Sequence, residues 1–223
     1  MVKDEQVRIL KGLINYLDSK TNVDAGGIMK APADTYTSQE RFDREWESFF
    51  LNHPQIIGMS GDLPKNNTFL TTEEFGKPIL ATRNEKGEFK AYANVCSHRG
   101  VIVEGEKRGE KSRFSCPFHG WTFSNEGSLV GYPKSDQFGE IDKDCYGLKE
   151  LPAIERFGFL WVHPKRDGKI DLDQLLGKEL TEEFKQWNFE SLVFANEDEY
   201  FTEMNWKLAI DTFGETYHFS VLH

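Results

Sequence analysis

Two short stretches of this chain bring a cysteine and a histidine close together. Residues 96–100 read Cys-Ser-His-Arg-Gly and residues 116–121 read Cys-Pro-Phe-His-Gly-Trp, with residues 99–115 between His98 and Cys116. Thiolate sulfur and imidazole nitrogen are strong ligands for iron and zinc. The two stretches therefore predict a metal site that is built from two loops.

The ligand set of this predicted site is two thiolates and two imidazoles. A Rieske-type [2Fe–2S] cluster needs that set, with two cysteines on one iron and two histidines on the other. Gly100 and Gly120 let the backbone turn tightly around the inorganic core, where amide N–H groups can donate to the sulfurs. We predict a Rieske-type cluster to which each loop gives one ligand per iron. The predicted ligands are Cys96, His98, Cys116 and His119.

A structural zinc site is the main alternative, because zinc also binds tetrahedral sets of Cys and His. Paired ligands in a zinc knuckle usually have two or more residues between them, whereas only Ser97 separates Cys96 from His98. A second alternative is that the cysteines are ordinary buried residues and the histidines are unrelated to them. It does not account for two matched Cys/His pairs on consecutive loops. Cys145 lies outside both loops, and we expect it to be a small buried hydrophobic residue without a role.

A second group of candidate ligands lies near the C-terminal end. On a helix from Asn205 to the end, the spacing of Asp211, Glu215 and His218 by four and three residues would place them on one face. His223 follows His218 by five residues, about 140° round an ideal helix. Both histidines can bind one metal only if a wide turn or break intervenes. On spacing alone, two histidines near a helix end are more often ordinary surface or core residues than metal ligands.

Composition limits the classes of function. The 223 residues carry a net charge of −10, which gives no electrostatic basis for nucleic-acid binding. No run approaches the roughly 18 apolar residues of a membrane span, and the charged start of the chain lacks a secretory signal. Three cysteines are too few for a disulfide framework. We expect a cytoplasmic protein without a membrane or nucleic-acid partner.

The elements around these motifs predict an α+β chain. Apolar residues at helical spacing predict a helix over residues 7–17, and a capping box of Thr37 and Glu40 predicts a second helix that stops before Pro54. Short β-like runs between residues 55 and 164, with hairpin turns at 84–87 and 125–127, predict an antiparallel domain, a two-layer β sandwich with the cluster loops. Beyond it we expect a helix at 172–184, a β-like segment at 189–201 and a last helix from 205.

The two loops and the C-terminal segment resemble the large (alpha) subunits of ring-hydroxylating and related Rieske non-haem iron oxygenases, over essentially the whole chain. Rieske proteins of respiratory complexes usually carry an extra cysteine in each loop, where this chain has Val101 and Phe118. The resemblance implies an N-terminal helical arm at 1–40, a Rieske [2Fe–2S] domain at 41–165, and the beginning of an α+β catalytic domain at 166–223.

The same resemblance implies roles at the C-terminal end. His218 and His223 match two ligands of a mononuclear Fe(II), and Glu215 matches the acid that bridges this iron site to the Rieske histidine of a neighbouring subunit. Many aromatic-ring dioxygenases have aspartate at that position, whereas glutamate is associated with relatives that oxidise quaternary ammonium substrates. The family supplies the third iron ligand far downstream. Asp211 is a possible substitute by proximity only.

The resemblance implies the oxygenase component of a system that takes electrons from a reductase or ferredoxin. With Fe(II) and O2 it would hydroxylate an aromatic compound or oxidatively demethylate a small organic substrate, as a homotrimer or trimer-based assembly. We expect the chain to be a fragment or a truncated protein that is inactive alone. A Rieske ferredoxin that only carries electrons and a zinc-stabilised binding module are the alternatives.

Overall fold

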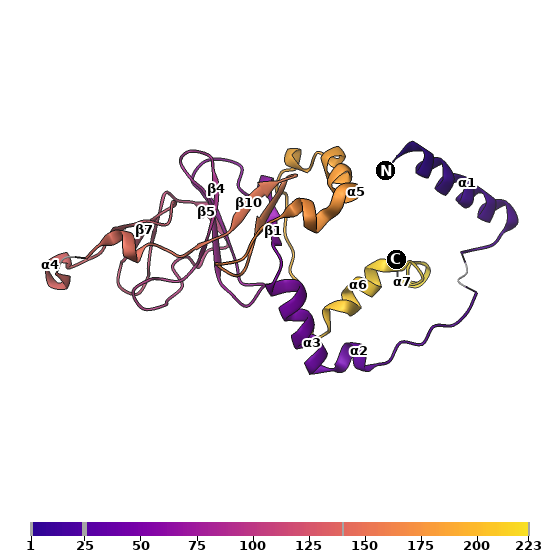
Figure 1. Ribbon diagram of the computed structural model, residues 1–223, viewed down its shortest axis with the longest axis horizontal. Coiled ribbons are helices and arrows are strands. Elements are labelled where there is room, and N and C mark those ends of the chain that lie inside the picture. Colours follow the sequence, from indigo (N-terminus) through magenta and orange to yellow (C-terminus); the bar gives the residue numbers. More distant parts are fainter. Residues whose placement is uncertain (1, 24–25, 140, 223) are drawn as a thin grey trace. The chain divides into compact units, whose positions relative to one another are not determined.

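The computed structural model describes residues 2–23, 26–139 and 141–222 (Figure 1). Contacts within the chain divide it into two compact units. One holds the described residues of the ranges 1–42 and 202–223, and the other holds residues 43–201. Both cysteine-histidine stretches lie in the second unit, and the candidate ligands of the C-terminal segment lie in the first.

The helices near the N-terminus follow the predicted pattern. Helix α1 (Lys3–Ser19) ends at Lys20, which adopts the left-handed conformation. Helices α2 (Asp34–Thr37) and α3 (Gln39–Glu45) follow, and a π-helical stretch, η1 (Trp46–Leu51), ends before the proline, as predicted. The capping residue was predicted one position too early, because Ser38 Oγ accepts the Arg41 N–H at 3.3 Å.

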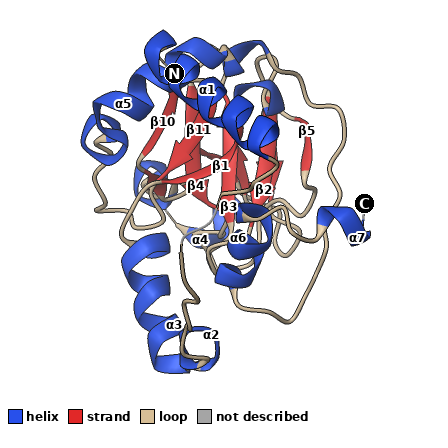
Figure 2. Ribbon diagram, turned by 90° about the vertical axis from the view of Figure 1, so that its right-hand side faces the viewer, coloured by secondary structure: helices blue, strands red, loops and turns tan. Residues whose placement is uncertain are grey.

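The described strands form three antiparallel sheets, which confirms the α+β class with an antiparallel β domain. Figure 2 shows β1, β10 and β11 of the first sheet side by side. The first sheet has the order β1 (Gln55–Met59), β11 (Phe159–Val162), β10 (Ala153–Arg156). The second has the order β5 (Arg108–Glu110), β2 (Thr68–Thr72), β3 (Ile79–Arg83), β4 (Phe89–Ala93), β9 (Glu150–Leu151). The third has the order β6 (Arg113–Ser115), β7 (Thr122–Ser124), β8 (Leu129–Gly131).

Both predicted hairpin turns are present. Asn84 Oδ1 accepts the N–H groups of Lys86 and Glu88, each at 2.9 Å, and so fixes the turn between β3 and β4. Gly87 and Gly127 have φ values of +82° and +78°, a conformation that glycine adopts without strain. The turns hold the strands in register, since each joins two neighbouring strands.

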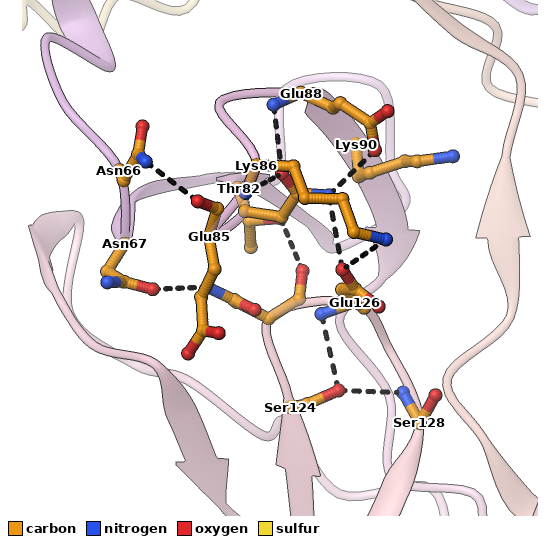
Figure 3. A network of polar contacts seen from close by, with 12 residues as sticks. Asn66, Asn67, Thr82, Glu85, Lys86, Glu88, Lys90, Ser124, Glu126 and Ser128 are labelled. Carbon is orange, nitrogen blue, oxygen red and sulfur yellow. Dashed lines mark hydrogen bonds and ion pairs between the residues drawn. The ribbon is translucent and has the colours of Figure 1, made fainter.

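A polar network, buried at Thr82 and Asn125 and exposed at Lys86 and Glu126, joins the turns of the second and third sheets (Figure 3). Thr82 Oγ1 donates to the Asn125 carbonyl at 2.8 Å, and Asn125 Nδ2 donates to Asn67 Oδ1 at 2.6 Å. Lys86 pairs with Glu126 at 3.5 Å across the same gap. Because buried polar groups need partners, this network fixes one sheet against the other. The two cysteine-histidine loops are thereby held in a constant relation.

An apolar core lies beneath the two loops and includes both of their cysteines. Aromatic rings form much of it, and Phe69 meets Phe114 edge to face with ring centroids 5.3 Å apart. The buried members of this cluster are Phe69, Leu80, Tyr92, Cys96, Val103, Phe114, Cys116, Trp121, Phe123, Leu129 and Leu148.

The remaining helices are short except one. Helix α5 (Leu172–Trp187) confirms the helix predicted at 172–184, but it is kinked at Gly177, whose backbone (φ 66°, ψ 176°) is not helical. The others are α4 (Ser135–Phe138), α6 (Trp206–Gly214), α7 (Phe219–Leu222) and the 3-10 turns η2 (Ser60–Asp62), η3 (Lys143–Tyr146) and η4 (Phe189–Ser191). Among the described helices, none is long and apolar enough to cross a membrane.

Two predicted elements are wrong. The β-like segment at 189–201 is a 3-10 turn followed by irregular chain, consistent with the low strand propensity of the Asn-Glu-Asp-Glu run at 196–199. The predicted helix from Asn205 to the end breaks after Gly214, a poor helix former. Glu215 has extended backbone (φ −128°, ψ 158°), and its carboxylate accepts the Tyr217 N–H, so the helix does not continue.

Candidate metal centre

The two cysteine-histidine loops have the same backbone geometry. The first follows β4 and precedes β5, while the second connects β6 to β7. In each, the cysteine N–H donates to the carbonyl five residues ahead, and the glycine N–H donates back to the cysteine carbonyl. The bonds are Cys96 N–H to Val101 O and Cys116 N–H to Trp121 O, both 2.8 Å, with Gly100 N–H to Cys96 O and Gly120 N–H to Cys116 O, both 2.9 Å.

The glycines explain why this turn is possible in both loops. Gly100 has φ +74° and Gly120 has φ +69°, so an L-residue at either position would be strained. A Cβ at Gly120 would also lie 3.1 Å from a Pro133 ring carbon. Both glycines turn the backbone as the sequence predicts.

The structure brings the four residues predicted as cluster ligands together. Cys96 and Cys116 are each 3% exposed, and both belong to the same buried cluster. The His98 and His119 ring centroids are 4.8 Å apart. Each loop thus contributes one buried thiol and one imidazole to a shared site, as a two-iron cluster requires.

The protonation states of these residues suit a metal group. Burial lowers the pKa of His98, with further contributions from His119 and Arg99, so its ring is neutral at pH 7. Burial raises the pKa of the Cys96 thiol. Its thiolate therefore needs a bound cation for stability, and metal ligation supplies one. Within the described residues, His98 Nδ1 is buried and has no hydrogen-bond partner. A Rieske cluster fits this donor set.

No three His, Cys, Asp or Glu side chains in the described ranges surround a single point as they would for one metal ion. A closed zinc site needs four such ligands around one ion. A Rieske centre instead gives each iron two protein ligands. The two loops offer two thiolates and two imidazoles, which is the number of protein ligands that such a centre needs.

An aromatic wall that sequence reasoning did not assign lies beside the histidines. Trp121 is 2% exposed and stacks on His98, with ring centroids 4.8 Å apart and an interplanar angle of 5°. Phe138 contacts both rings edge to face, at 6.1 Å from each. Phe118 lies against His119, with centroids 3.8 Å apart. The signal for Trp121 was its place directly after the second loop.

The candidate residues of the C-terminal segment are only partly brought together. Glu215 Oε1 lies 2.5 Å from His218 Nδ1, and this hydrogen bond lowers the pKa of the Glu215 carboxyl. Asp211 accepts the Tyr36 hydroxyl at 2.7 Å. The break at residues 215–218 ends at His218, and the residues between His218 and His223 form helix α7, so the wide turn or break that joint binding requires is not seen in the described residues between them. His223 itself lies outside the described residues.

The expectation that Cys145 is buried is wrong. It lies in the 3-10 turn η3 with its side chain exposed. Its thiol donates to Asp142 Oδ2 at 3.3 Å, and this contact raises the pKa of the thiol. The sequence pattern gave no signal for the turn, which begins with the Asp142 side chain accepting the Asp144 N–H.

Comparisons with known proteins agree with this site. The Rieske [2Fe-2S] domain family matches residues 53–152, and the ring hydroxylating alpha subunit (catalytic domain) family matches residues 189–223. Toluate 1,2-dioxygenase subunit alpha of Pseudomonas putida is 32% identical over 94% of this chain and 48% of its own length. The carnitine monooxygenase oxygenase subunit of Acinetobacter baumannii is 29% identical over 86% of this chain and 52% of its own length.

Solved structures show the same fold. A quaternary ammonium Rieske monooxygenase in complex with L-carnitine matches with a TM-score of 0.74 and 26% identity, over 86% of this chain and 59% of that one. Naphthalene 1,2-dioxygenase with bound indole matches with a TM-score of 0.57 and 28% identity, over 62% of this chain and 31% of that one.

The chain spans about half the length of the curated relatives it matches. The matched families carry a Rieske [2Fe–2S] cluster and a mononuclear iron. On its two matched loops, its family matches and its fold, the chain belongs to the Rieske non-haem iron oxygenases and is similar to their large (alpha) subunits.

Proposed function

We propose that this chain is the electron-accepting front part of an oxygenase component that uses O2 to oxidise a small organic substrate. The observation that carries this proposal is the pair of equivalent loops, which bring two buried thiols and two imidazoles to one site. The match of residues 189–223 to the catalytic-domain family supports oxygenase chemistry beyond electron transfer.

We assign the cluster to Cys96, His98, Cys116 and His119. When bound, the cluster supplies one-electron transfer, and a mononuclear Fe(II) supplies the activation of O2. The protein's own contribution is to hold the imidazoles. The Trp121 ring covers one face of His98, and burial keeps that ring neutral and ready to ligate. The loop backbones hold both cysteines in the core.

We assign His218 and His223 to the mononuclear iron, and Glu215 to the path between the two metal sites. The hydrogen bond between Glu215 and His218 supports this role, since a carboxylate that accepts from a ligand histidine fixes its ring and tautomer. The same contact supports Glu215 as an acid that remains ionised at pH 7.

The partners that we propose are a reductase or ferredoxin as electron donor and, for a longer chain, two further copies of the large subunit. The relatives include both aromatic dioxygenases and monooxygenases of quaternary amines. Two points support a quaternary ammonium or similar small substrate. The resemblance matches the glutamate Glu215 to the bridging acid, and a quaternary ammonium Rieske monooxygenase covers 88% of this chain at a TM-score of 0.75, against 63% and 0.58 for a naphthalene dioxygenase.

A Rieske ferredoxin is the other candidate function. It is disfavoured by residues 189–223, because a carrier needs little beyond the β domain. The test is to supply a chain that carries a complete large-subunit catalytic domain behind these residues with a reductase, NADH and candidate substrates. Substrate-dependent O2 consumption supports an oxygenase. Rapid cluster reduction without any O2 consumption, with both metal sites occupied, supports a carrier.

A further inference from the structure

Residues 189–201 belong to two parts of the protein at once. By sequence they open the catalytic-domain match, yet they pack in the same compact unit as the β domain. Residues 192–201, which we call the strap, are exposed and have no regular secondary structure. Apolar burial therefore does little to hold the strap in place, and other contacts must do so.

The first contact is a backbone notch at Gly61. A Cβ on Gly61 would lie 2.1 Å from the Leu192 carbonyl oxygen and 3.1 Å from the Val193 Cα. Real side chains do not tolerate such distances, so the strap enters at a place that only glycine leaves open. The φ of Gly61 is not positive, so alanine fits the backbone there and would clash with the strap alone.

The chain just before the strap is fixed in a similar way. A Cβ on Gly158 would lie 2.5 Å from the Glu190 nitrogen. The Phe189 ring packs on Phe159, with centroids 4.8 Å apart, and on Trp187 at 5.8 Å. The near end of the strap is thus anchored by steric fit and aromatic packing.

The far half of the strap is held by charge. Arg108, on edge strand β5, donates to Glu197 of the strap at 3.0 Å and to Asp62 at 2.7 Å. Its guanidinium also lies over the Phe194 ring, 4.4 Å from the centroid. Lys107, the preceding residue, pairs with Glu199. Arg108 at the start of β5 and Lys107 just before it therefore hold two acids of the strap.

One acid opposes this latch. Glu74 lies on the same side of the domain, and its pKa is raised by burial and by the nearby Glu197 and Glu199. An open cavity of about 690 Å³, lined partly by Glu74, Lys107 and strap residues, lies at the strap. The far half of the strap is therefore not packed into the core. Attraction to Arg108 and Lys107, against repulsion by Glu74, decides whether it stays attached to the domain.

We propose that Gly61 and Arg108 are positioning residues that fasten the start of the catalytic-domain sequence to the Rieske domain. Gly61 accepts the strap backbone, and Arg108 latches the acidic half with Lys107. The attachment is electrostatic at its far end, so salt releases residues 197–201 while the glycine-docked end remains. This assignment rests on the structure and the family match, and it holds whether or not the chain acts as an oxygenase.

The test is limited digestion of the purified chain with chymotrypsin. Fragments are counted by mass, and cleavage after Phe194, Tyr200 and Phe201 is compared with cleavage outside the strap in the same digest. At low salt, Arg108→Gln should raise the strap cleavage rate about fivefold. That factor is what the loss of one partly exposed ion pair is expected to add to the population of the released strap. Glu74→Gln should lower it, because a repelling charge is removed.

Salt and sterics separate the two attachments. Raising the salt to about 0.5 M, where screening is strong, should speed strap cleavage in the wild type more than in Arg108→Gln, because that variant has only the Lys107–Glu199 pair left to screen. Gly61→Ala should speed cleavage at both salt concentrations, because its effect is steric. The matched control is Lys65→Gln. It removes an exposed ion pair, 2.6 Å between Lys65 Nζ and the carboxylate of Glu110, which lies on β5 like Arg108. This variant should leave the strap cleavage rate unchanged.

The proposal is overturned if Arg108→Gln and Gly61→Ala are both cleaved in the strap at the wild-type rate. It is also overturned if Lys65→Gln speeds strap cleavage as much as Arg108→Gln, since the effect would then reflect general loosening of β5. Cluster content, read from visible absorbance in the same samples, reports the proposed function separately.

Discussion

The indole of Trp121 lies flat against the imidazole of His98, with ring centroids 4.8 Å apart and planes 5° from parallel. Trp121 also contacts Phe138, Tyr132 and Tyr146. The His98 ring has few orientations left to it, because the buried Trp121 ring covers one of its faces. The aromatic wall therefore holds the His98 nitrogen where a cluster iron would be bound.

Trp121→Leu should weaken this hold. We expect a loss of stability of about 2–4 kcal/mol from the cavity, together with faster loss of visible absorbance at room temperature. Trp121→Phe should retain most of the absorbance, because an aromatic face remains. The half-time of bleaching and the melting temperature of each variant are the measurements. Equal bleaching of the Leu variant and the wild type would remove this role.

The ligand assignment predicts the result of single substitutions. Cys96→Ser or His119→Ala should abolish the cluster and its absorbance, because each removes one of four ligands. Cys145→Ser is the matched control for the thiol change, since Cys145 is exposed and outside the loops. His218→Ala should leave the cluster intact. A normal spectrum from Cys96→Ser would contradict the assignment.

Glu215→Gln should separate metal binding from coupling in a chain that includes the remaining catalytic domain. We expect both metal sites to fill, because neither loses a proposed ligand, while substrate-coupled turnover falls at least tenfold. The neutral amide oxygen is a weaker acceptor for the His218 ring than the carboxylate is. Glu203→Gln, a nearby acidic residue without a proposed role, is the control. Unchanged coupled turnover would rule out the bridging role.

His163 predicts a pH dependence of stability in the Rieske domain. Burial lowers its pKa, and its Nδ1 accepts the Lys165 N–H at 3.1 Å, so the folded state favours the neutral ring. The unfolded chain therefore binds more protons below about pH 6.5, and stability is full above that pH and declines as the pH falls.

Melting temperatures measured between about pH 7.5 and 5 test this prediction, with about 2–4 °C expected for each kcal/mol lost. His163→Asn keeps an acceptor for the Lys165 N–H but cannot be protonated, so its melting temperature should depend less on pH. The same pH slope in both proteins would assign the effect to other groups.

The sequence predicted what local patterns determine. Helix α1, the turns at Asn84 and Asn125, and the glycines of both loops follow from spacing and backbone preference. The convergence of the two loops depends on tertiary pairing, and the ligand chemistry predicted it because one cluster needs both. What failed depended on contacts that the pattern does not show.

Three failures illustrate this limit. The strap was predicted as β-like, but a glycine notch and an ion pair hold it without a partner strand. The last helix breaks because the Glu215 carboxylate binds a nearby backbone N–H instead of leaving the helix to continue. The contact of Trp121 with the His98 ring was not predicted, because the sequence indicates that a tryptophan is buried but not which ring it covers.

The most direct test is the iron and acid-labile sulfide content of the purified chain, with an EPR spectrum after dithionite reduction. The account predicts about two irons and two sulfides per Rieske domain and a Rieske-type signal. Bound zinc, or iron without labile sulfide, would contradict it.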